Sequence, residues 1–122
     1  NGAIERVARN TGVLFSIAAG NGSESSDSYS PAMSEGRGIY TVCATTRDKR
    51  IAGFSNFGAP PVDICAPGAG VVSLGLEGEL VMKSGTSMAA PHVAALLALG
   101  KLDNDGFAKS AGDGGSYPIA HI

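Results

Sequence analysis

The chain has 122 residues, a formal net charge of -2, 43% hydrophobic residues and 16% charged residues. This length and composition predict one globular domain with a hydrophobic core. No cluster of Lys and Arg is present, so nucleic acid and anionic membrane surfaces are excluded as expected partners. No apolar run is long enough to span a membrane.

The first half of the chain predicts a helix followed by two buried strands. Residues 3–10 form the end of an amphipathic helix, because Ile4 and Val7 lie on one face. Continuous apolar runs follow at residues 13–19 and 40–45. A short apolar run bounded by turn residues is typical of a buried parallel strand.

The second half predicts a third strand, a hairpin and a helix. Residues 62–66 form a short strand, and residues 71–74 and 79–82 pair as a hairpin. Residues 88–99 are apolar nearly all round, which is typical of a helix buried in a core. This order of elements indicates an α/β fold with a mostly parallel sheet.

The last segment, residues 101–122, is polar and rich in Gly and Asp. We expect a loosely ordered extension with one short strand near residues 117–119. Asp103, Asp105 and Asp113 faintly resemble a calcium-binding loop, but they lack the full ligand spacing. A solvated turn is therefore favoured, and no metal site is predicted.

The chain contains two cysteines, Cys43 and Cys65. Two cysteines do not make a disulfide framework, and these two do not have the spacing of a metal site. Free cysteine is among the most buried residue types, so two small buried thiols are favoured. A single disulfide between them is the alternative left open.

The most informative segment is residues 85–94, with the sequence GTSMAAPHVA. It places Ser87 where a turn of small residues enters the apolar helix. The unpaired N–H groups and the positive end of the helix dipole stabilise negative charge there, as an acyl-transfer enzyme requires beside its nucleophile. The plain alternative is a helix-capping serine. The segment does not match Gly-x-Ser-x-Gly, which argues against an α/β-hydrolase elbow.

The run at residues 85–94 closely resembles the nucleophile motif of the subtilisin-like serine proteases, or subtilases. Residues 18–21 (AAGN) resemble the oxyanion-hole segment of that family. Residues 54–58 (FSNFG) and 63–68 (DICAPG) resemble two further family segments in the right order. The resemblance extends over about residues 3–100. It implies part of a subtilisin-like three-layer sandwich, with a mostly parallel sheet and a buried helix after the nucleophile.

The resemblance implies roles for individual residues. Ser87 is expected to attack the scissile carbonyl, and the side-chain amide of Asn21 is expected to hold the oxyanion together with the Ser87 N–H. A simple turn residue is the alternative for Asn21. The residues expected to contact substrate are Ala18, Ala19, Gly20 and Thr86.

The chain departs from the family in lacking a catalytic base. A serine needs one to act as an efficient nucleophile at neutral pH. The family supplies a His, oriented by an Asp, and both precede the Ser motif, whereas no histidine precedes Ser87 here. His92 corresponds to a packing residue in the family, and His121 is not expected to serve either. We therefore expect residues 1–100 to be the C-terminal portion of a subtilase catalytic domain, followed by an extension at 101–122.

The function implied by the resemblance is that of a serine-type endopeptidase acting through an acyl-enzyme on Ser87, with the triad Asp and His supplied by sequence outside this chain. The alternative is a catalytically inactive subtilase fragment that serves as a structural or oligomerising module. The isolated chain is expected to be inactive. The expected partners are a peptide or protein substrate, and either the N-terminal portion of the protease domain or a second copy. No cofactor is evident; the resemblance alone suggests calcium and a secreted or extracytoplasmic location.

Overall fold

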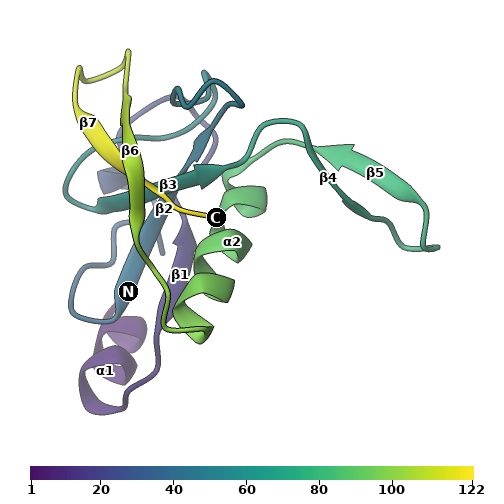
Figure 1. Cartoon of the computed structure of the whole chain (residues 1–122). Coiled ribbons are helices and arrows are strands. Elements are labelled where there is room, and N and C mark those ends of the chain that lie inside the picture. Colours follow the sequence, from purple (N-terminus) through teal and green to yellow (C-terminus); the bar gives the residue numbers. More distant parts are fainter.

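The computed structural model describes all 122 residues. Its elements in chain order are α1 (Gly2–Asn10), β1 (Phe15–Ala18), a 3-10 turn (Ser26–Ser28), β2 (Ile39–Thr45), β3 (Val62–Pro67), β4 (Val71–Leu74), β5 (Leu80–Lys83), α2 (Thr86–Ala98), β6 (Asn104–Lys109) and β7 (Ser116–Ala120). Five strands form the central sheet in the order β1-β2-β3-β7-β6 (Figure 1). All neighbours in it are parallel except β6 and β7, which are antiparallel.

Helix α2 packs against β1, β2 and β3 and encloses the main core. Alternate residues of a strand point to opposite faces of the sheet. Val42 and Ala44 of β2 accordingly join Val93 of α2 in one cluster, whereas Cys43 joins Tyr117 in a second cluster. A strand covered on both faces is expected to be mostly apolar without strict alternation, and β2 has that pattern apart from Thr41 and Thr45. The predicted α/β class with a mostly parallel sheet is confirmed.

The apolar helix after Ser87 packs on the sheet with one side and exposes an apolar face on the other, as expected if this chain is a portion of a larger domain. In α2 only Thr86, Ala89 and Val93 are buried. The face opposite the sheet is exposed to solvent, and we call it the outer face of α2. It comprises Pro91, Ala94, Ala95 and Ala98. The chain provides one covering layer for α2, the sheet, so an apolar composition on every side does not bring burial on every side.

The two cysteines are bridged, contrary to the free thiols that we favoured. Cys43 of β2 and Cys65 of β3 are direct register partners, with their Cα atoms 4.4 Å apart. This separation falls within the range that a disulfide spans, and both residues are fully buried. The bridge therefore links two adjacent strands of the central sheet.

The segment after residue 100 is more regular than the loosely ordered extension that we expected. It forms an antiparallel hairpin of β6 and β7, and β7 includes the short strand predicted near residues 117–119. Strand β7 pairs with β3 through Cys65 and Ile119. This pairing covers a strand that would otherwise be the edge of the parallel sheet.

The predicted hairpin of residues 71–74 and 79–82 is confirmed as β4 and β5. It extends away from the sheet, to the right in Figure 1. Its cross-strand pairs Val72–Met82 and Leu74–Leu80 occupy one face of the ribbon, and all four side chains are exposed. The hairpin therefore carries an apolar surface that nothing in the chain covers.

Candidate active site

Ser87 is the second residue of α2, and its side chain is exposed at the N-terminus of the helix. Gly85 precedes the helix with φ +151°, a conformation that L side chains rarely adopt. The first N–H groups of a helix have no intrahelical acceptor and point outward with the positive end of the dipole. The Ser87 N–H is thus available to an incoming oxyanion beside the Ser87 hydroxyl.

Asn21 follows the carboxyl end of β1 and lies beside the N-terminus of α2. Its Oδ1 accepts hydrogen bonds from the Thr86 N–H at 2.8 Å and from the Thr86 hydroxyl at 3.0 Å. Its Nδ2 lies 3.6 Å from the point where a Cβ at Gly85 would stand. The structure therefore brings Asn21 next to the turn that carries Ser87, although the two are 66 positions apart in the printed sequence.

Because Oδ1 of Asn21 is occupied by two donors, the amide nitrogen is the group left to act on a ligand. Asn21 is exposed and its Nδ2 makes no hydrogen bond within the chain, which leaves it free to donate. Two donors, the Asn21 amide and the Ser87 N–H, therefore stand at one end of the sheet beside a serine hydroxyl. This is the composition of an oxyanion hole for acyl transfer.

Thr86 joins the two halves of this arrangement. It is fully buried, and its hydroxyl oxygen also accepts a hydrogen bond from the Gly20 N–H at 3.1 Å. One hydroxyl thus holds both the backbone before Asn21 and the Asn21 side chain. The buried side chain of Thr86 holds Asn21, and the contact with substrate that we expected from Thr86 stays a prediction. The contacts expected from Ala18, Ala19 and Gly20 stay predictions.

Asn56 is a residue at this site that sequence reasoning missed. It is fully buried, and its side chain bonds to the loop that carries Asn21. Gly20, with φ +108°, allows this close approach, because a Cβ at Gly20 would lie 2.5 Å from Asn56 Nδ2. The segment FSNFG was noted only as a family motif, and no spacing in the sequence pairs it with residues 18–21.

Neither histidine forms a hydrogen bond with Ser87. The Nδ1 atom of His92 lies 2.9 Å from the carbonyl oxygen of Met88, one turn back along α2. His121 lies two positions before the end of the printed sequence, and its N–H donates to the carbonyl oxygen of Asp103. The nucleophile role of Ser87, the oxyanion role of Asn21 and the base expected from outside this chain stay predictions.

The carboxylates that resembled a calcium loop are engaged in other contacts. Asp105 forms an exposed ion pair with Lys49 at 2.8 Å, and this lysine lowers the pKa of the Asp105 carboxyl. Asp113 accepts hydrogen bonds from the Tyr117 hydroxyl and from the Gly115 N–H. No group of three or more His, Cys, Asp or Glu side chains gathers as a metal site would require. No helix has the length and apolar character needed to cross a membrane.

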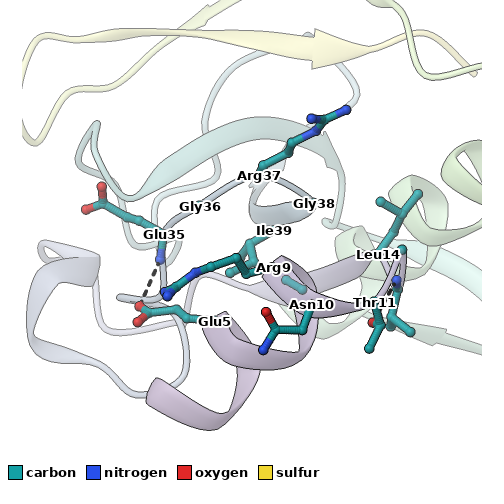
Figure 2. Close-up of a pocket in the computed structure, with 13 residues that line it drawn as sticks. Glu5, Arg9, Asn10, Thr11, Leu14, Glu35, Gly36, Arg37, Gly38 and Ile39 are labelled. Carbon is teal, nitrogen blue, oxygen red and sulfur yellow. Dashed lines mark hydrogen bonds between the residues drawn. The ribbon is translucent and has the colours of Figure 1, made fainter.

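A cavity of about 630 Å³ lies away from this site. It lies between the end of α1 and the segments that enter β1 and β2, as Figure 2 shows. Its wall includes charged side chains of both signs, and the Glu35 N–H donates to Glu5 Oε1 across it at 3.4 Å. Ser87 and Asn21 lie at the carboxyl ends of the parallel strands, where open α/β sheets bind ligands. We therefore take this end of the sheet, and not the cavity beside α1, as the candidate site.

The chain is similar in sequence to known proteins. The model of the family described as "Subtilase family" (Peptidase S8) matches residues 1–111. Proteinase R of Parengyodontium album is 46% identical over 88 residues, which cover 72% of this chain and 22% of that protein. Subtilisin-like protease 4 of Trichophyton rubrum is 41% identical over 96 residues, covering 79% of this chain and 23% of that protein.

Solved structures show the same relationship. A cold-adapted subtilisin-like serine proteinase superposes with a TM-score of 0.67 and 41% identity, covering 71% of this chain and 31% of that one. A protease of Pseudoalteromonas arctica gives a TM-score of 0.72 and 34% identity, covering 80% of this chain and 32% of that one. The chain spans less than a quarter of the length of the curated relatives described above. By sequence and by fold, this chain belongs to the subtilase family.

Proposed function

We propose that this chain supplies the nucleophile and the oxyanion hole of a subtilisin-like serine endopeptidase. The observation that carries the proposal is the arrangement of Asn21, Thr86 and Ser87, in which a buried threonine fixes Asn21 beside the exposed serine at the helix N-terminus. The substrate is a peptide or protein. The triad Asp and His come from sequence outside these residues, as the family resemblance implies.

In the proposed reaction, Ser87 Oγ attacks the carbonyl carbon of the scissile peptide bond while the external His accepts its proton. The carbonyl oxygen becomes an oxyanion and receives hydrogen bonds from the Ser87 N–H and from Asn21 Nδ2. The C–N bond then breaks, the amine leaves with the proton from the His, and an acyl-enzyme remains on Ser87. Water then takes the place of the amine, and the same steps in reverse order release the acyl group as an acid and restore the Ser87 hydroxyl.

The proposal makes the isolated chain inactive, because an unassisted serine hydroxyl is a weak nucleophile at neutral pH. The outer face of α2 and the apolar face of the β4–β5 hairpin are uncovered, which supports association with a further element. That element is either the rest of a subtilase domain or a second copy of the chain. The buried Cys43–Cys65 bridge supports a secreted or extracytoplasmic location, since disulfides persist in oxidising compartments.

A fluorophosphonate probe tests the proposal. Ser87 is expected to be labelled when the portion of a protease domain carrying the Asp and His is present, and Ser87→Ala is expected to abolish the labelling. No labelling in a folded, assembled protein would instead support the second candidate, a non-catalytic structural or oligomerising module. The uncovered apolar surfaces are the observation that favours that second candidate.

A further inference from the structure

We infer that Asn56 is a positioning residue that fixes the aim of Asn21 in the oxyanion hole. This inference rests on the proposed function. Asn56 is fully buried, although its side chain is polar, and it contacts the loop that carries Asn21 on both sides of that residue. A buried amide is costly unless its groups are hydrogen-bonded, so these contacts define the conformation of the loop.

The contacts divide between the two sides of Asn21. On the preceding side, Asn56 Nδ2 donates to the Ala19 carbonyl oxygen at 3.2 Å, and the Asn56 N–H donates to the Gly20 carbonyl oxygen at 2.9 Å. On the following side, Asn56 Oδ1 accepts from the Gly22 N–H at 2.8 Å and from the Glu24 N–H at 3.1 Å. The peptide groups on both sides of Asn21 are thus held by one residue, Asn56, which lies in the loop between β2 and β3.

Asn56 itself is anchored to the sheet through its neighbour Ser55. The Ser55 hydroxyl donates to the Asn56 carbonyl oxygen at 3.0 Å and accepts from the Ala44 N–H in β2 at 2.9 Å. Hydrogen bonds through Asn56 and Ser55 therefore connect the loop around Asn21 to β2 in the sheet. Thr86 holds the side-chain oxygen of Asn21, and Asn56 holds the backbone from which that side chain projects.

Removal of Asn56 should misplace the Asn21 amide without removing it. A displacement of about 1 Å at a catalytic group can reduce turnover by about 10²-fold. We expect Asn56→Ala to lower kcat by about 10- to 100-fold with little change in KM, because the oxyanion forms only in the transition state.

A double-mutant cycle separates positioning from a general structural role. The measurement is kcat and KM for peptide hydrolysis by the complete protease. If Asn56 acts through Asn21, then Asn56→Ala in the Asn21→Ala background should change kcat by less than about threefold. Equal losses of kcat in both backgrounds would overturn the inference.

Ser26→Ala is the matched control. Ser26 is equally buried, and its hydroxyl donates to the same Ala19 carbonyl oxygen at 3.1 Å, but its side chain holds nothing on the far side of Asn21. It should lower stability and leave kcat of the folded enzyme unchanged. A loss of kcat as large as that of Asn56→Ala would overturn the inference. Where Asn56→Ala does not fold, Asn56→Asp replaces it. A carboxylate oxygen then stands in place of Nδ2 against the Ala19 carbonyl oxygen, and their repulsion, which Ser26→Ala does not create, should displace the loop and lower kcat. A kcat unchanged by Asn56→Asp would also overturn the inference.

A second readout keeps this test independent of the proposed function. The NMR signal of the Asn21 side-chain amide, identified by its loss in Asn21→Ala, should shift in the Asn56 variants and not in Ser26→Ala. Absence of any Ser87-dependent turnover would defeat the proposed function, and the amide signal would then decide the role of Asn56. An Asn21 signal unaffected by the loss of Asn56 would overturn the inference.

Discussion

The Thr86 hydroxyl contributes both to the geometry of the candidate oxyanion hole and to the stability of the fold. Its removal is therefore the sharpest single perturbation of this account. Thr86→Val replaces the hydroxyl with a methyl group of similar size. The Gly20 N–H then loses its acceptor at 3.1 Å, and Asn21 Oδ1 loses one of its two donors. The other donor, the Thr86 N–H at 2.8 Å, remains.

Two magnitudes follow from these contacts. A backbone N–H left without a partner costs about 1–3 kcal/mol, so the free energy of unfolding should fall by that amount. Removal of one oxyanion-hole donor lowers kcat by about 10²–10³-fold in a subtilisin. Thr86→Val keeps the Asn21 amide as a donor but removes one of the hydrogen bonds that fix its position. We therefore expect a smaller loss of kcat, of about 3- to 30-fold.

The assays are urea denaturation and steady-state hydrolysis of a peptide by the complete protease. Thr86→Ser is the matched control, because it keeps the hydroxyl and loses only a buried methyl group. It should retain nearly the full kcat. Equal kcat values for the Val and Ser variants would refute the role given to this hydroxyl.

Three further predictions test other parts of the account. Asn21→Ala should lower kcat by about 10²–10³-fold with KM little changed, and a loss confined to KM would contradict an oxyanion role. The disulfide closes a loop with a sequence separation of 22, so Cys43→Ala with Cys65→Ala should lower the free energy of unfolding in urea by about 3 kcal/mol; an unchanged midpoint would contradict this. Burial, aided by a hydrogen bond to a carboxylate, raises the pKa of Tyr117 to about 12 from 10.0. Its contribution to stability should be complete below pH 10 and lost as the pH rises through about 12, and Tyr117→Phe should remove that part of the alkaline decline in stability.

Strands β1, β2 and β3 of the central sheet could be predicted because local pattern and tertiary environment agree there, whereas β6 was not predicted. Strand β2 is mostly apolar, and the structure covers it on both faces. The turn before α2 could also be predicted, since Gly85 stands directly before the run of residues that forms the apolar helix. Both features depend on residues that are close in the sequence.

What could not be predicted depends on pairing between distant segments. The bridge between Cys43 and Cys65 follows from the register of β2 against β3, which includes an irregularity near Thr41. Which residues of α2 form its exposed outer face depends on the side that meets the sheet, and a helix that is apolar all round does not show that side in its sequence. The hydrogen bonds of Asn56 connect two loops that are distant in the sequence, and the sequence of neither loop indicates that they pair.

The most direct test of the central claim is the rate of fluorophosphonate labelling at Ser87, measured with and without the Asp- and His-bearing portion of a protease domain. The account predicts rapid labelling only when that portion is present, and none in Ser87→Ala. Equally rapid labelling of the isolated chain would contradict the claim that the base lies outside these residues. No labelling of the assembled protein would contradict the claim that Ser87 is a nucleophile.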